Sequence, residues 1–138
     1  MSHSITFFVA GEPAPKGSTR AFVVNGRPII TNANRRTKDW EMRIATEAQA
    51  LGRECVSCPV AVHGWFILPR PKSLPRKVLH HVKKPDLDKL GRALLDGLTG
   101  ILYVDDSQVV ELSLSKHYAS AGEPTGVRVM LDHLGAEA

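Results

Sequence analysis

The sequence lacks the features that direct a chain into a membrane or a secretory pathway. No apolar run approaches the roughly 20 residues that a membrane-spanning helix needs. The first nine residues have no basic segment and only a short apolar stretch, so they do not resemble a signal peptide. We therefore expect a cytoplasmic protein that does not contact membranes.

Cysteine is also scarce, because Cys55 and Cys58 are the only two in the chain. A structural zinc site needs four ligands, and nothing fixes His80 and His81 near this C-x-x-C pair. A redox motif would be expected beside a βαβ pattern, whereas this pair precedes Pro59. We interpret both cysteines as reduced thiols.

No internal repeat or second domain is apparent in the 138 residues, of which 43% are hydrophobic and 23% charged. Such a composition is typical of a globular protein. The apolar patterns predict one α/β (α+β) domain over residues 1–138, with a mixed β-sheet and two principal helices. Strands are expected at 5–10, 60–68, 109–116 and 126–134, a hairpin at 21–30, and helices at about 34–53 and from 86 to Gly97 or Gly100.

The expected elements differ in how their apolar residues are spaced. Asn25-Gly26 suits the tight turn of the hairpin, and residues 60–68 lack alternation, which favours the middle of a sheet. Residues 109–116 and 126–134 both alternate, and the turn-rich segment 120–124 joins them. These two strands are therefore predicted to form a terminal antiparallel pair.

Positive charge is unevenly distributed along this basic chain, which has a net charge of +4 and a pI near 9.3. Eight Lys and Arg residues lie between Arg70 and Arg92, against only Asp86 and Asp88. One interpretation is a solvated loop; the other is a surface that follows DNA phosphates. The predicted DNA-binding residues are Lys16, Arg20, Arg70, Lys72, Arg76, Lys77, Lys83 and Lys84.

Two aspartate pairs, Asp86 with Asp88 and Asp105 with Asp106, interrupt the basic region. Carboxylates this close repel one another unless a cation lies between them, and Mg²⁺ takes such oxygen ligands. A structural reading stays open, in which Asp86 caps a helix and Asp105-Asp106-Ser107 forms a turn. Because the intervening helix has only about three turns, we expect the second pair to return near the first.

These residues resemble the RusA family of Holliday junction resolvases. The resemblance rests on Lys84-Pro85-Asp86-Leu87-Asp88, Leu95-Asp96-Gly97-Leu98-Thr99-Gly100, Val104-Asp105-Asp106-Ser107-Gln108-Val109 and the opening Gly11-Glu12-Pro13-Ala14-Pro15-Lys16-Gly17. It implies a homodimeric endodeoxyribonuclease that uses Mg²⁺ or Mn²⁺ to resolve four-way DNA junctions in recombination and repair. By position, the implied metal ligands are Asp86, Asp88 and Asp106. The family often has Asn at the position of Lys89 and Lys at that of Arg92.

The resulting hypothesis places one set of three aspartates in each subunit, with the metal ion polarising the scissile phosphate. Lys89 or Arg92 would stabilise the transition state electrostatically, and two sites in a symmetric dimer would suit a two-fold symmetric junction. Two alternatives remain. One is a non-catalytic basic DNA-binding protein, and the other is a structure-selective nuclease without junction preference.

Overall fold

The computed structural model describes residues 4–17, 19–32 and 35–135, without the side chains of residues 19–24 and 28–32. Its elements are β1 (Ser4–Ala10), β2 (Thr19–Val24), β3 (Arg27–Asn32), α1 (Arg35–Ala50), β4 (Val60–Leu68), α2 (Leu87–Leu98), the short 3₁₀ turn η1 (Asp106–Gln108), β5 (Val109–Tyr118) and β6 (Gly126–His133). The predicted single-domain α+β fold with two helices and a mixed sheet is confirmed. Among the described residues, no helix is long and apolar enough to cross a membrane.

The main sheet has four strands in the order β1-β6-β4-β5. β4 pairs with β6 in antiparallel and with β5 in parallel orientation, so its predicted place inside the sheet is confirmed. The predicted antiparallel pairing of the last two strands is wrong, because β4 lies between them. β4 and β5 are parallel, so they need a crossover connection, and α2 lies in that connection. β6 lies between β1 and β4.

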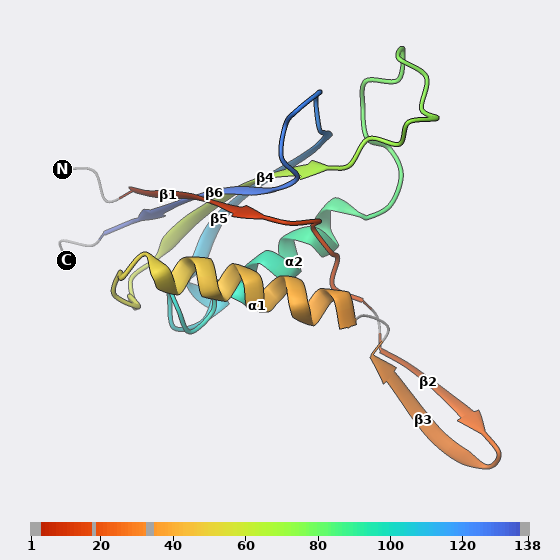
Figure 1. The fold of residues 1–138 in the computed structure, drawn as a ribbon. Coiled ribbons are helices and arrows are strands. Elements are labelled where there is room, and N and C mark those ends of the chain that lie inside the picture. The colour runs from red at the N-terminus through yellow and green to blue at the C-terminus, as the bar shows by residue number, and fades with distance from the viewer. Residues whose placement is uncertain (1–3, 18, 33–34, 136–138) are drawn as a thin grey trace.

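Both helices pack on one face of this sheet (Figure 1). The expected helical stripes form the core, with Trp40, Ile44 and Ala48 from α1 and Leu90, Leu94 and Leu98 from α2. The helices approach closely at Gly97, where a Cβ atom would lie 2.8 Å from the Cβ and Cγ2 atoms of Ile44. α2 ends at Leu98 with Thr99 as its C-cap, and Gly100 follows with φ of +81°. The core thereby fixes the direction of α2, whose first turn carries an aspartate pair.

β5 lies at an edge of the sheet, and its predicted burial pattern is only partly correct. Leu114 packs against the core, but 61% of Val110 and 46% of Leu112 remain exposed. By contrast, the predicted stripe of β6, Val127, Val129 and Leu131, is fully buried. Since a central strand has neighbours on both sides, alternation predicts burial better for β6 than for an edge strand.

The β2–β3 hairpin projects away from the sheet and helices (Figure 1). Asn25 and Gly26 have φ of 52° and 77°, as the predicted tight turn requires. The backbone of Arg20 lies in β2, but its side chain falls outside the described part of the structure. Residue 34, the expected start of the first helix, also lies outside it, and the helix ends at Ala50 rather than at residue 53.

Candidate functional site

The first aspartate pair lies at the N-terminus of α2. Asp86 has the extended backbone of an N-cap, and its carbonyl oxygen accepts the Leu90 N–H at 3.1 Å. Its side chain makes no capping hydrogen bond, and both Asp86 and Asp88 are exposed. The predicted N-cap position of Asp86 is therefore confirmed. Its carboxylate, however, does not accept the backbone N–H hydrogen bond that a capping side chain normally accepts.

Two cations on α2 accompany this pair. Lys89 Nζ lies 3.7 Å from an Asp86 carboxylate oxygen, and this lysine is half-buried. Arg92 follows Asp88 at i,i+4, on the same side of the helix, but within the described residues the two form no ion pair. Arg92 is exposed, so its guanidinium is accessible to an anion from solvent.

The two aspartates of the second pair, Asp105 and Asp106, have different roles. The Asp105 carboxylate accepts the Ser107 N–H at 3.0 Å. Hydrogen bonding with the Ser107 side chain, and then with its backbone N–H, lowers the Asp105 pKa. Gln108 completes a capping box by accepting the Asp105 N–H, and its amide donates to the Val56 and Cys58 carbonyls at 2.9 Å. Asp106 is exposed and takes no part in this network.

Sequence reasoning overlooked Gln108, although an Asp followed three residues later by Gln is a recognisable capping-box pattern. By tying η1 to the segment around Val56, Gln108 fixes the turn that presents Asp106.

The two pairs do not come together within one chain. Lys116 of β5 hydrogen-bonds to the carbonyl of Pro85, so Asp86 lies near that end of the strand. Asp106 immediately precedes the opposite end of β5, and the strand from Val109 to Lys116 covers about 23 Å. No three His, Cys, Asp or Glu side chains in the described ranges form a group able to hold a metal ion. The expected return of the second pair to the first is therefore wrong within a single chain.

Lys116 is a second residue that sequence reasoning overlooked. Its Nζ donates to the carbonyls of Lys83 and Pro85, both at 2.8 Å, and fixes the backbone just before Asp86. The Lys84–Pro85 peptide bond in this segment is cis. The sequence contains a signal for this role: Lys116 occupies the next position of the stripe formed by Val110, Leu112 and Leu114, where an apolar residue would be expected.

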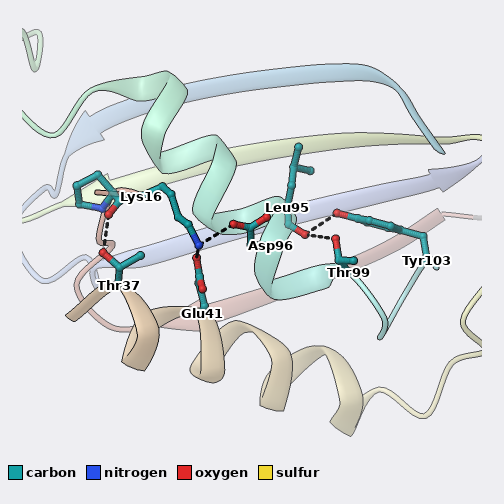
Figure 2. A network of polar contacts seen from close by, with 8 residues as sticks. Lys16, Thr37, Glu41, Leu95, Asp96, Thr99 and Tyr103 are labelled. Atoms are coloured by element: carbon teal, nitrogen blue, oxygen red, sulfur yellow. Dashed lines mark hydrogen bonds and ion pairs between the residues drawn. The ribbon is translucent and has the colours of Figure 1, made fainter. Parts of the chain in front are cut away.

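Two of the predicted DNA-binding cations make internal contacts. Lys16 Nζ lies 2.9 Å from Asp96 and 3.1 Å from Glu41, and thus links the two helices (Figure 2). These partners raise the pKa of Lys16, with the hydrogen bond to Asp96 as the largest cause. Arg70 donates to the Pro75 carbonyl at 2.8 Å and lies over the Tyr118 ring at 5.3 Å.

The other predicted cations with described side chains remain available to solvent. Within the described part of the chain they are exposed and form no ion pair; they are Lys72, Arg76, Lys77, Lys83 and Lys84. All five belong to the long connection between β4 and α2, which leads directly to Asp86. A cationic surface therefore adjoins the first aspartate pair.

A cavity of about 670 Å³, which we call the α2 groove, opens at the start of α2. It is lined by residues 12–17, Arg36, Leu68, Pro69, Pro71, His81, residues 83–86, Lys89 and Tyr118. His81 and Tyr118 pack ring against ring, with centroids 4.3 Å apart. Burial, together with the nearby Lys116 charge, lowers the pKa of His81. The groove thus combines an aromatic pair, lysines and one of the candidate metal ligands.

The two cysteines take no part in this site. Both are free thiols, with Cys55 exposed and Cys58 half-buried. Within the described residues they belong to no metal-binding group.

Comparison with known proteins finds a matching family model and a similar protein. The family model described as endodeoxyribonuclease RusA matches residues 10–132. The chain is also 30% identical over 143 residues to the uncharacterized protein YqaN of Bacillus subtilis (strain 168), covering 96% of this chain and 98% of YqaN. The matched range contains both aspartate pairs, Lys116 and all residues that line the α2 groove.

Proposed function

Because the chain belongs to the RusA family of endodeoxyribonucleases, we propose that it is a metal-dependent endonuclease that resolves four-way DNA junctions in recombination and repair. The observation that carries this proposal is the family match over residues 10–132, a range in which both aspartate pairs are solvent-exposed. Branched DNA is the proposed partner, and Mg²⁺ or Mn²⁺ the proposed cofactor.

The donor chemistry of three aspartates supports the metal assignment. Asp86, Asp88 and Asp106 are exposed carboxylates, and oxygen ligands of this kind suit hard divalent cations. The Asp86 side chain is not used in capping, and Asp105 takes the capping role beside Asp106. A bound ion would stabilise the negative charge that develops on the scissile phosphate.

The remaining site residues would act on the same phosphate or hold the site in place. Lys89, beside Asp86, offsets the mutual repulsion of the carboxylates and can donate to a phosphate oxygen. Arg92 lies on the Asp88 side of α2 and presents a second cation. Lys116 is a positioning residue, because it holds the backbone that precedes Asp86.

A homodimer would bring the separated aspartates together. α2 is 12 residues long, about 18 Å, and the two pairs lie near its opposite ends. In a two-fold dimer with antiparallel α2 helices, Asp106 of the partner subunit would lie beside Asp86 and Asp88. Val104, Val110 and Leu112 support such a contact, because these exposed apolar side chains lie close to Asp106 in the chain and two of them are on the free edge of the sheet.

The exposed lysines and arginines between β4 and α2 would bind the DNA backbone. Contacts of this type position DNA without reading its sequence, and each phosphate contact adds to the salt dependence of binding. The loop enters α2 at Asp86, so a strand held by Lys83 and Lys84 would reach the proposed metal site directly.

The test is cleavage of a labelled four-way junction and a linear duplex of matched sequence, with Mg²⁺, with Mn²⁺ and with chelator. The proposal predicts paired nicks confined to the junction and abolished by chelator. Equal cutting of both substrates would leave a nuclease without junction preference. Salt-sensitive binding without cutting in either metal would contradict the proposal and favour a non-catalytic DNA-binding protein.

A further inference from the structure

The α2 groove contains an aromatic pair that the proposed phosphate chemistry does not use. Tyr118 is 8% exposed at the end of β5, and the half-buried His81 lies against it with an angle of 32° between the ring planes. Both residues line the same cavity as Asp86. Catalysis at a metal-bound phosphate needs no aromatic surface, so the part of this pair that faces the groove is available for a further contact.

Arg70 lies over the Tyr118 ring at 5.3 Å, and the ring surface of the pair that still faces the groove, chiefly that of the half-buried His81, offers a flat face and a polar edge. Burial and the Lys116 charge keep the His81 pKa below its usual 6.5, so its imidazole is neutral at pH 7 and has one donor and one acceptor nitrogen. Nδ1 is buried, and hydrogen bonding with the backbone of His81 and Lys83 partly offsets the lowering of the pKa. Stacking and edge hydrogen bonds are the interactions by which proteins hold single nucleobases.

The lining of the groove also includes cationic and apolar side chains. Lys83 and Lys84 lie in the chain between His81 and Asp86, and neither forms an ion pair in the described part of the structure. Pro13, Ala14 and Leu68 supply apolar lining. The cavity of about 670 Å³ is within the range of small-ligand pockets. These features fit a flat base linked to a phosphate.

We propose that the α2 groove binds one unpaired nucleotide of the DNA strand, with its base against His81 and Tyr118 and its phosphate toward Lys83, Lys84 and Asp86. The proposal rests on the proposed nuclease function, since it takes Asp86 as part of the reacting site. A base must leave the duplex stack to enter the groove, which costs a few kcal/mol and least where it is already unpaired. The groove therefore favours branched or distorted DNA over regular duplex.

The experiment uses a four-way junction with one unpaired 5-iododeoxyuridine at the branch point, bound in the presence of chelator and irradiated. We expect crosslinks in the tryptic peptides 78–83, which contains His81, and 117–128, which contains Tyr118. His81→Ala should reduce the yield on peptide 117–128 by about fivefold or more, in line with the loss of one stacking partner. Its affinity for the junction should stay within about threefold of wild type, because backbone contacts dominate it.

His80→Ala is the matched control, because His80 is exposed and does not line the groove. His81→Phe keeps a flat ring and should retain the crosslink, which also covers the case in which His81→Ala fails to fold. Wild-type yield in His81→Ala, or crosslinks confined to other peptides, would overturn the proposal.

The two proposals fail separately in these experiments. Metal-dependent junction cleavage without crosslinks at His81 or Tyr118 would contradict nucleotide binding in the α2 groove but would support the proposed nuclease function. Crosslinks at these residues without cleavage in Mg²⁺ or Mn²⁺ would retain the nucleotide groove in a protein that does not cut DNA.

Discussion

Replacing Lys16 with methionine should destabilise the fold and leave DNA binding essentially unchanged. Lys16 lies between the two helices, with its Nζ within 2.9 Å of Asp96 and 3.1 Å of Glu41 (Figure 2). Its backbone N–H also donates to the Lys89 carbonyl at 3.0 Å, a contact that methionine would keep. The substitution thus removes the charge but preserves most of the side-chain length.

The size of the effect follows from the exposure of these ion pairs. The Lys16 side chain is 39% exposed, with Asp96 at 40% and Glu41 at 18%, so solvent screens both interactions. Partly exposed pairs of this kind contribute about 0.2–1 kcal/mol each, and together they should contribute about 1 kcal/mol. For 138 residues the unfolding entropy is about 0.29 kcal/mol/K, so Tm should fall by about 3 °C.

The same contacts make the effect depend on pH. Asp96 and Glu41 raise the Lys16 pKa above 10.5, against a smaller opposing effect of burial. A raised pKa means that the folded state holds the proton more tightly than the unfolded chain. The stabilisation is therefore fully present below pH 10.5 and is lost as the pH rises through the folded-state pKa. The stability difference between wild type and Lys16→Met should shrink in that range.

Urea unfolding from pH 7 to 11 and salt titration of DNA binding measure both predictions. Lys77→Met is the matched control, because Lys77 is exposed and forms no ion pair in the described part of the chain. Lys16→Met combined with Asp96→Asn should destabilise less than the sum of the single changes. An unchanged unfolding free energy in urea, together with a salt slope of DNA binding reduced by about one, would refute this reasoning and indicate that Lys16 contacts a DNA phosphate.

Three further substitutions test other parts of the structure. Asp88→Asn should abolish metal-dependent cleavage while junction affinity is preserved; normal cutting would disprove the metal assignment, with Asp39→Asn as an exposed control. Lys116→Met should slow cleavage at saturating junction by about tenfold or more, because misplacing a reacting group by about 1 Å is costly; an unchanged rate would remove its positioning role. Gly97→Val should lower unfolding free energy by about 1–3 kcal/mol through overpacking against Ile44, and wild-type urea stability would contradict that packing.

Local periodicity was sufficient to predict the helices and the central strand. Leu90, Leu94 and Leu98 recur at helical spacing and are fully buried in α2. The lack of alternation in residues 60–68 correctly indicated a strand with neighbours on both sides. These features depend on a single segment and its burial, which the sequence records directly.

Strand pairing depends on distant segments and was predicted incorrectly. The turn-rich segment 120–124 resembles a hairpin connection, yet β6 pairs with β1 and β4 instead. Alternation in β5 suggested burial of Val110 and Leu112, but no strand covers the free edge of β5 within the described chain. A pattern within one strand does not specify which partner covers it.

In the candidate site, too, the local features were predicted and the arrangement of distant segments was not. The position of Asp86 at the start of α2 was predicted, because a proline and an N-cap residue precede an apolar stripe. Its distance from Asp106 was not, because β5 runs parallel to β4. The residue of β5 that returns to the start of α2 is therefore Lys116 rather than Asp106.

The most direct test of the central claim is to mix two inactive variants, Asp88→Asn and Asp106→Asn, and measure Mg²⁺-dependent nicking of a four-way junction. If each site combines Asp86 and Asp88 of one subunit with Asp106 of the partner subunit, every mixed dimer regains one intact site. After complete subunit exchange, about a quarter of all sites should then be active, with single nicks rather than paired cuts. No recovery of nicking, from a mixture in which subunit exchange is demonstrated, would contradict a metal site divided between two subunits.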